Sequence, residues 1–451
     1  MSATAAEGAS PGRLSYGRVF AIALPVVLSN ALLPLQGAID TAIIGNLGDT
    51  TLLAGIALGA GAIPLIFSSL NFLQIGVSGT TAQALGAGNT TRVANTLLRA
   101  LLIAWLCAGV LILLQVPLVA AVLALFEASD AVEAAAGSYV EIRLWGAPFE
   151  LANFALIGWF AGQERTRRLF ELQLVLSLTN IALTASFVLG FGMGIEGVAL
   201  GTVLGHLAAL LFGLWHVRAR LREILPAGWR PERARLLDTG ELSALLRLNR
   251  DLFIRTIMLT LSFAWVTRLS SQQGDVLLAT NGILFEFLVV STAGLDGFAI
   301  AAETLVGQAI GARSAQRLRR AILLSSVAAG LLALLFALLM AIFAMDIVHL
   351  FTTVEEVRSA ATHYFLWAAL IPLAGVAAFQ LDGIFVGAAA GPAMRNTMIT
   401  VAVVFLPVGT LLTEAFGNHG LWAAVWFMLL LRAVLLAWRL PRLIASLSAT
   451  P

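Results

Sequence analysis

Several ionisable side chains lie inside long apolar stretches of this chain, where a charge is costly, and six of them stand out. They are Asp40, Arg255, Glu286, Asp296, Glu303 and Asp382. A charged side chain at the centre of a lipid bilayer costs about 2.5–3.5 kcal/mol on insertion scales, so such residues usually pair with one another or serve a function. These six residues are therefore the first candidates for binding an ion or a charged small molecule.

Asp40 is the strongest of these candidates because its neighbours in the sequence offer it no counter-charge. It lies near the far end of the first apolar stretch, 18–43, with no Arg within one helical turn. Pro25 and Pro34 precede it, and each removes a backbone hydrogen bond and lets a helix bend. Burial disfavours the charged form of a carboxyl group, so Asp40 is expected to bind and release a proton. The alternative is an aspartate at headgroup level, solvated from outside.

Four polar side chains on later apolar stretches are expected at a depth similar to that of Asp40. They are Tyr139, Asn180, Thr184 and Thr202. Oxygen ligands of this kind suit either a proton network or a hard cation such as Na⁺. A single Asn or Thr in a membrane helix more often hydrogen-bonds to a neighbouring helix, so only convergence on Asp40 would make a site.

The second half of the chain carries the other acids. Asp296 and Glu303 are seven residues apart, close to two helical turns, and so share one helix face. We expect Glu303 and Asp382, near helix ends, to pair with arginines, and Glu286 and Asp296 to lie deeper. Arg255 is the expected internal counter-charge, but the sequence does not say which acid it meets.

Composition places these residues in a membrane. Of the 451 residues, 59% are hydrophobic and 12% are charged, and the mean hydropathy is +0.93. Soluble domains average about 25% charged residues. A membrane helix needs about 20 mostly apolar residues. The apolar runs predict twelve spans, at 18–43, 52–77, 94–117, 137–160, 169–190, 195–217, 247–270, 277–305, 321–343, 359–386, 396–415 and 420–439.

The arginines predict how these spans are oriented. All 27 basic residues are Arg, and most of them lie in alternate loops. Positive charge stays on the cytoplasmic side during insertion, so both termini are expected in the cytoplasm. The expected location is a bacterial inner membrane. The segments 1–16 and 441–451 are expected to be cytoplasmic tails, and no cleavable signal sequence precedes the first span. Arginines at helix ends contact lipid headgroups, which argues against nucleic acid as a partner.

The apolar sequence occurs twice, with a nearly constant shift of 225 residues. Residues 82–87, AQALGA, correspond to residues 307–312, GQAIGA, and Gly158 corresponds to Gly383. Many secondary transporters consist of such duplicated halves, with the substrate path between them. We therefore expect an all-α polytopic fold of two pseudo-symmetric six-helix lobes, at 17–217 and 247–440. An Arg-rich linker, 218–246, is expected to join them.

Signatures of enzymes and of ATP-driven transport are absent from the sequence. It contains no Gly-x-x-x-x-Gly-Lys-Ser/Thr phosphate loop and no His-Glu-x-x-His zinc motif. With five scattered His and the single Cys107, no metal site and no catalytic set is expected. His206 is more readily a packing residue than a proton relay. We expect no cofactor, and an ion gradient as the energy source.

Taken together, these segments resemble the multidrug and toxic compound extrusion (MATE) family, specifically its DinF-like branch. The resemblance covers essentially the whole chain. Its most specific segments are 249–256 (NRDLFIRT), 295–309 (LDGFAIAAETLVGQA), 380–387 (QLDGIFVG) and 394–396 (MRN).

The resemblance implies a V-shaped pair of lobes that works by alternating access, as a monomer. Small cationic, lipophilic drugs would leave the cell in exchange for H⁺ or Na⁺. In DinF-like relatives the coupling carboxylate lies on helix one, which matches Asp40, and the polar cluster around it matches Tyr139, Asn180 and Thr202. Relatives often have a second acid where this chain has Thr184, and its loss favours H⁺ over Na⁺.

Two other classes of protein compete with this interpretation. A flippase for a polyprenol-linked sugar precursor would need a basic central cavity, whereas the intramembrane charges here are mostly acidic. A membrane-embedded enzyme would need a convergent catalytic set.

Overall fold

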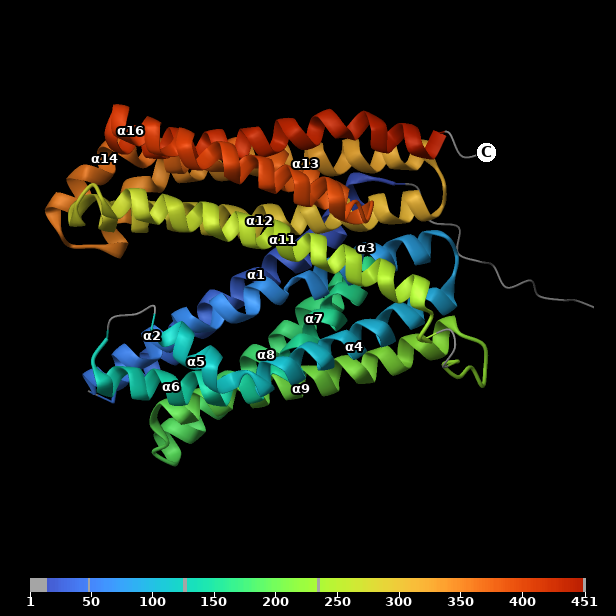
Figure 1. The fold of residues 1–451 in the computed structure, drawn as a ribbon, viewed down its shortest axis with the longest axis horizontal. Helices are drawn as coiled ribbons and strands as arrows, with labels where there is room; N and C mark the ends of the chain where they lie inside the picture. Colours follow the sequence, from blue (N-terminus) through green and yellow to red (C-terminus); the bar gives the residue numbers. More distant parts are fainter. Residues whose placement is uncertain (1–13, 48, 125–127, 233–235, 449–451) are drawn as a thin grey trace, which may run out of the picture.

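The structure, a computed structural model, describes residues 14–47, 49–124, 128–232 and 236–448. Within these ranges it consists of helices, turns and short connections, without β-strands. Figure 1 shows two bundles of long helices that meet at one end and spread apart toward the other. The predicted all-α fold of two lobes is therefore confirmed.

The first bundle, the N-lobe, contains the helices up to residue 224. They are α1 (Tyr16–Gly45), α2 (Thr50–Phe67), the 3₁₀ turn η1 (Ser68–Leu70), α3 (Phe72–Gly86), α4 (Thr90–Leu113), α5 (Gln115–Leu123), α6 (Asp130–Trp145), α7 (Ala147–Gly162), α8 (Thr166–Ala185), the π-helical turn η2 (Ser186–Gly190) and α9 (Gly194–Ile224). The second bundle, the C-lobe, contains α11 (Thr239–Ser271), α12 (Asp275–Gly311), α13 (Ala315–Phe351), α14 (Glu355–Ala369), α15 (Ile371–Gly387) and α16 (Gly391–Ser448).

The helices account for the twelve predicted spans. Ten helical segments of the described residues are long and apolar enough to cross a membrane. α6 and α7 together make an eleventh pass, broken at Gly146. The twelfth arises because α16 turns back at Gly417, whose φ of 57° and ψ of −136° are not helical. A positive φ favours glycine, which has no Cβ to clash with the backbone.

The structure differs from the sequence prediction in the Arg-rich segments. α9 continues to Ile224 and α11 begins at Thr239, so much of the expected linker 218–246 is helical. α16 continues to Ser448, through most of the expected tail 441–451. Apolar runs mark only the part of a helix that lies in hydrocarbon, whereas these helices continue where arginines can reach headgroups and water. Most of the expected tail 1–16 lies outside the described residues.

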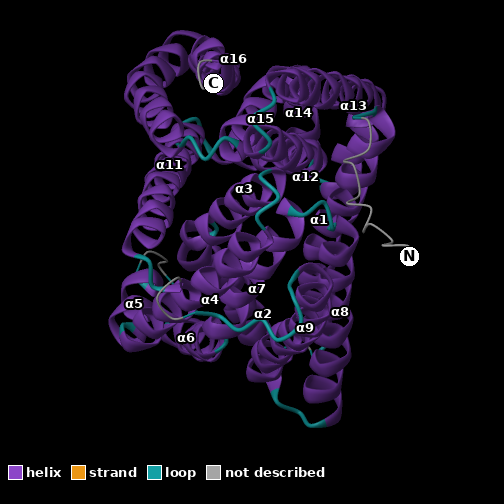
Figure 2. Ribbon diagram, turned by 90° about the vertical axis from the view of Figure 1, so that its right-hand side faces the viewer, coloured by secondary structure: helices purple, strands orange, loops and turns teal. Residues whose placement is uncertain are grey.

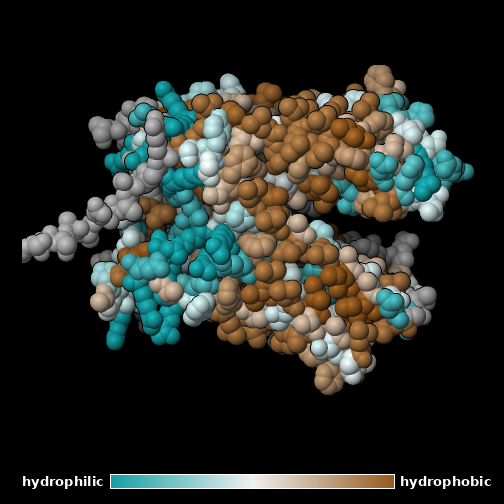
Figure 3. All heavy atoms as spheres, turned by 180° about the vertical axis from the view of Figure 1, so that it is seen from behind, coloured by the Kyte–Doolittle hydropathy of each residue, from teal (hydrophilic) through white to brown (hydrophobic). Residues whose placement is uncertain are grey.

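The lobes meet at the end where α1 begins and α16 ends, which we call the basal end; the opposite end is the distal end. α1 and α3 of the N-lobe pack against α12 of the C-lobe, and the view along the long axis places these helices at the junction (Figure 2). Figure 3 shows polar surface concentrated toward the basal end, a broad apolar band, and lobes that separate toward the distal end. The structure is therefore closed at the basal end and open at the distal end.

The sequence repeat corresponds to a repeated helix crossing. In the N-lobe, glycines of α7 lie against carbonyl groups of α3, and in the C-lobe glycines of α15 lie against carbonyl groups of α12. The matched contacts are Gly158–Gln74 with Gly383–Ala299, and Gly162–Ser78 with Gly387–Glu303. An added Cβ would collide at each of these glycines, so the close crossing requires them.

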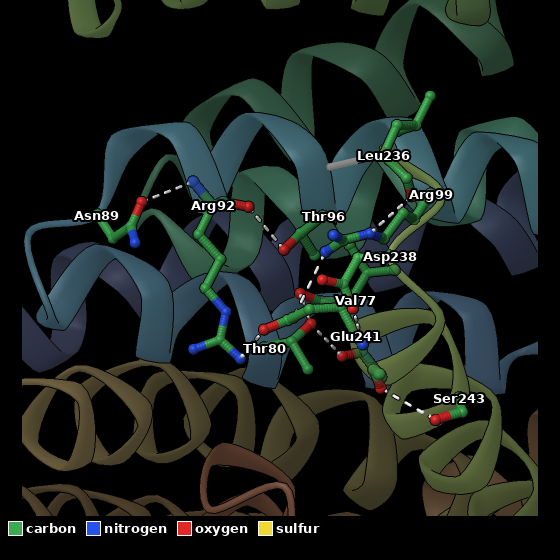
Figure 4. Close-up of polar contacts among 12 residues, drawn as sticks. Val77, Thr80, Asn89, Arg92, Thr96, Arg99, Leu236, Asp238, Glu241 and Ser243 are labelled. Atoms are coloured by element: carbon green, nitrogen blue, oxygen red, sulfur yellow. Dashed lines mark hydrogen bonds and ion pairs between the residues drawn. The ribbon is translucent and has the colours of Figure 1, made fainter. Parts of the chain in front are cut away.

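Two sets of contacts close the basal end. Gly86 lies against Gln308 and Gly311 against Gln83, so the two copies of the repeated motif touch each other. A polar clasp reinforces this closure: Arg92 and Arg99 of α4 meet Glu241 in the first turn of α11, at 3.3 and 3.4 Å (Figure 4). We call these three residues the basal clasp.

The residues next to the basal clasp hold it in place. Arg99 is buried, and its Nε donates a hydrogen bond to the carbonyl oxygen of Leu236 at 3.1 Å (Figure 4). Asp238 caps α11 by accepting a hydrogen bond from the backbone N–H of Glu241 at 3.0 Å. The cap begins the helix at a position that presents Glu241 to both arginines.

Candidate functional site

Asp40 lies near the distal end of α1 with only 7% of its surface exposed. Asn180 and Thr184 of α8 lie close enough to act on its carboxyl group as weak hydrogen-bond donors. Asp40 Oδ1 and Thr184 Oγ1 have no hydrogen-bond partner among the described residues. Asp40 also forms no ion pair within the described part of the chain. It is a buried carboxyl group in polar but incompletely bonded surroundings.

The structure brings the other predicted N-lobe residues to the same place. Asn180 Nδ2 donates a hydrogen bond to Thr202 Oγ1 of α9 at 2.8 Å. Gly201 lets α9 approach α8 closely at Thr184. Tyr139 of α6 is buried and lies within electrostatic range of Asp40. The convergence on which a site depends is therefore present.

A buried ion pair beside Asp40 was missed in the sequence analysis. Arg143 of α6 and Glu150 of α7 are 5% and 7% exposed, and Arg143 Nη2 lies 3.0 Å from Glu150 Oε2. His206 Nε2 is 3.5 Å from the same Glu150 oxygen. Arg143 also lies within electrostatic range of Asp40 and Tyr139. The available signal was two opposite charges, seven residues apart, inside the predicted span 137–160.

A cavity of about 620 Å³ lies between the two lobes. Aromatic side chains from both lobes form part of its wall: Phe67, Phe154, Phe263 and Phe379. Its charged lining residues are Glu150, Arg255, Asp296, Glu303, Asp382 and Arg432. Asp40 is not among the described residues that line this cavity. Among these lining residues, the four acids outnumber the two arginines.

The C-lobe charges form a cluster around Asp382. Arg255 Nη2 and Arg432 Nη2 both contact Asp382 Oδ2, and Arg432 Nε donates to Oδ1 at 3.1 Å. The structure thus assigns Asp382 as the acid that meets Arg255, and Asp382 is paired as expected. Asp296 lies within electrostatic range of both arginines. Arg432, which is buried on α16, was missed although it falls inside the predicted span 420–439.

Glu303 and Glu286 do not lie as predicted. Glu303 was expected to pair with an arginine; instead it is 6% exposed, and its Oε1 has no hydrogen-bond partner among the described residues. It faces Ser78 of α3, at the crossing where Gly387 of α15 lies against the Glu303 carbonyl group of α12. Glu286 is exposed and does not line the cavity. Ten residues separate it from Asp296, which is not a whole number of turns, so the two residues face different ways.

The charged residues of the described ranges do not form a metal centre. No group of three or more His, Cys, Asp or Glu side chains in these ranges could hold a metal ion. Cys107 is a half-buried free thiol. The arrangement supports charge neutralisation and binding at isolated carboxyl groups.

The comparisons with known proteins agree with this geometry. The MatE family model matches the chain twice, at residues 25–186 and 252–411, which are nearly the two halves of the sequence repeat. The chain is 37% identical to the DNA damage-inducible protein F of Escherichia coli K12 over 427 residues, 93% of this chain and 91% of that protein. It is 26% identical to the probable multidrug resistance protein NorM of Rhizobium meliloti over 433 residues, 91% of this chain and 90% of that one.

Solved structures share the fold. One is described as the outward-facing conformation of a multidrug resistance MATE family transporter of the MOP superfamily. It matches with a TM-score of 0.85 at 17% identity, over 96% of this chain and 97% of that one. Since the family model covers both halves and the relatives match at nearly full length, the chain belongs to the MatE family of membrane transporters, which are not enzymes, and within it resembles the DinF-like branch.

Proposed function

We propose that this chain exports cationic, lipophilic compounds in exchange for protons, by alternating access of the central cavity to the two sides of the membrane. One observation carries the proposal: Asp40 is a buried carboxyl group without an ion-pair partner in the described structure, in the same lobe as part of an aromatic-walled cavity whose charged lining is mostly acidic. An apolar cavity with a few charged groups suits amphipathic ligands. The relatives named as multidrug resistance proteins support the same class of substrate.

The arginines support an assignment of the two ends. The basal end carries Arg165 and Arg313 in the turns before α8 and α13, and Arg395 near the start of α16. It also holds the start of α1 and the end of α16 (Figure 1). By the positive-inside rule, the basal end is cytoplasmic and both termini are inside. With this assignment the open distal end faces outward, and we expect the protein to work as a monomer in a bacterial inner membrane.

A proton suits Asp40 better than Na⁺ does. A hard cation in a protein site prefers about six oxygen ligands, several of them charged. The side chains that act on Asp40 are the neutral Asn180 and Thr184 and the cation Arg143, which lies close enough to repel a metal ion. A proton needs one carboxyl oxygen and no coordination shell.

The alternative of a flippase for a polyprenol-linked sugar precursor rests on Arg255 and Arg432, which line the cavity and could meet a diphosphate. Both arginines are already bound to Asp382, however. An anionic substrate would have to displace this carboxylate. The cavity therefore favours cations.

Transport assays in liposomes test the proposal. The purified protein is reconstituted, and uptake or efflux of a cationic dye is measured under an imposed pH gradient, with and without Na⁺. Transport driven by the proton gradient alone is expected. A strict Na⁺ requirement would overturn proton coupling, and failure to move any cation would favour the flippase.

A pair of isosteric variants tests the role of Asp40. Asp40→Asn should abolish dye-driven proton movement, because an amide cannot take up the proton. Glu286→Gln removes another intramembrane carboxylate that lies away from the cavity, and it should transport like the parent protein. Export against a gradient by Asp40→Asn would show that the coupling group is elsewhere.

A further inference from the structure

The position of Asp40 raises a problem for direct competition between proton and drug. Such competition requires the drug to reach the carboxyl group that binds the proton. Asp40 is buried and does not line the 620 Å³ cavity, whereas Glu150, in the same lobe, does. Binding of a cation in the cavity and protonation of Asp40 therefore need a connection.

Arg143 occupies the position from which it can make that connection. Only its Nη2 is hydrogen-bonded, to Glu150, while Nε and Nη1 have no partner among the described residues. The nearby Asp40 Oδ1 is unpartnered too. A guanidinium group has five N–H donors in a rigid fork, and unbonded donors in a buried site are costly. Arg143 thus has one acid bonded and a second within electrostatic range.

We propose that Arg143 is a tethered cation that moves between Glu150 and Asp40 and thereby makes proton binding and substrate binding mutually exclusive. The inference rests on the proposed function. When Asp40 is ionised, it draws Arg143 away from Glu150, and Glu150 becomes free to hold a cationic substrate in the cavity. When Asp40 takes up a proton, it loses its charge, Arg143 returns to Glu150, and the substrate loses its counter-charge. The described structure, with Arg143 on Glu150, corresponds to the second state.

The groups that face this switch come from four helices. They are Asp40 on α1, Tyr139 and Arg143 on α6, Glu150 on α7 and His206 on α9. α2 and α8, which also pack here, contribute no titratable side chain at this level in the described structure. Because His206 contacts Glu150, protonation of His206 is the rival source of any pH dependence. The experiment must separate protonation of His206 from protonation of Asp40.

Equilibrium binding of tetraphenylphosphonium to the purified full-length protein in nanodiscs tests the proposal. In the parent protein, one proton displaces one cation, so affinity should fall by up to about tenfold per pH unit across the titration. In Arg143→Gln, Glu150 has no internal cation at any pH. Its affinity at about pH 6 should match that at about pH 8 within roughly twofold, and should exceed that of the parent at about pH 6. A merely structural role for Arg143 would not tighten binding.

Further variants complete the test. Arg143→Lys keeps the charge and should keep the pH dependence of binding. Arg165→Gln, the control, removes an ion pair with Glu223 at the basal end of the same lobe and should also keep it. His206→Gln should also keep the pH dependence of binding. Loss of the pH dependence in this variant would overturn the role of Asp40. Should Arg143→Gln not fold, Glu150→Gln replaces it, with weak binding expected at every pH.

The possible failures are distinguishable. A parent protein that binds no cation, or binds it without any pH dependence, contradicts the proposed function itself. A pH-dependent parent with an equally pH-dependent Arg143→Gln contradicts the tethered cation alone.

Discussion

The two lobes share one helix crossing and differ in how they hold their buried acids. In the N-lobe, Asp40 has no ion pair within the described residues, and Arg143, which lies within electrostatic range of it, is bonded to Glu150 instead. In the C-lobe, Asp382 is bound by Arg255 and Arg432 together. A carboxylate held by two arginines is fixed as an anion, whereas one without a bonded cation is free to change its protonation state.

The difference shows which features the duplication kept. The glycines that let α7 cross α3 have equivalents in the crossing of α15 over α12, since backbone contact leaves no room for a side chain. The charges have no such equivalents: Ala368 and Gly375 occupy the positions that match Arg143 and Glu150. The backbone arrangement is therefore common to both lobes, while each lobe carries its own charged site.

The largest effect is expected from removing the charge of Asp382. Asp382→Asn leaves Arg255 and Arg432 buried without their anion, and breaking a buried pair in this way costs about 3–5 kcal/mol. Asp40→Asn removes a carboxylate that has no bonded cation, so no buried charge loses its partner and the loss of stability should be much smaller. Thermal unfolding of both variants, followed by tryptophan fluorescence, checks the contrast. Equal losses of stability would show that Asp40 is as firmly paired as Asp382.

A smaller effect is expected from Glu303, where the two lobes meet. Ser78 and Glu303 hold equivalent positions of the repeat and face each other, but only the C-lobe residue carries a charge. Glu303→Gln should weaken binding of a cationic ligand about tenfold, or about 1.4 kcal/mol. The pH dependence should remain, because Asp40 and Arg143 are intact. Equilibrium binding at two pH values measures both quantities, with Ser78→Ala as a control that leaves the charge unchanged. Unchanged affinity would place the ligand away from Glu303.

Much of the fold could be predicted from the sequence, because lipid imposes a simple length and polarity rule on each helix. The twelve passes and the two lobes follow from apolar runs and from the repeat. The site was only partly predictable. Tyr139, Asn180, Thr184 and Thr202 converge on Asp40 as depth alone suggested, but depth says nothing about which face of a helix a residue occupies. That is why Glu286 was grouped with Asp296 and why Glu303 was expected to have an arginine.

The pairing of Arg143 with Glu150 could not be derived from the spans either. The two residues meet because the pass they share is broken at Gly146, so that α6 and α7 are two helices rather than one. Charges seven residues apart on a continuous helix would lie about 10 Å from each other. A break within an apolar run leaves no clear mark in hydropathy.

The smallest effect is expected at the basal clasp, where Glu241, the carboxylate that joins the lobes, is partly exposed to solvent. Glu241→Gln weakens the contacts with Arg92 and Arg99, but Arg99 keeps its bond to Leu236 and the glycine contacts between α3 and α12 remain. Exposed ion pairs contribute about 0.2–1 kcal/mol, so the closed basal end should become less populated by no more than about fivefold.

Labelling of a cysteine placed at position 80 measures the population of the closed basal end. Thr80 lines a cavity of about 180 Å³ beside the clasp, and opening of the basal end would enlarge this cavity. In a Cys107→Ser background, Thr80→Cys should react modestly faster with a membrane-impermeant maleimide when Glu241→Gln is added. Glu223→Gln is the matched control: it also breaks exposed contacts, with Arg165 and Arg220, but within one lobe. If both variants label like the parent, the basal closure depends on the helix packing of the repeated motif and the clasp contributes nothing to it.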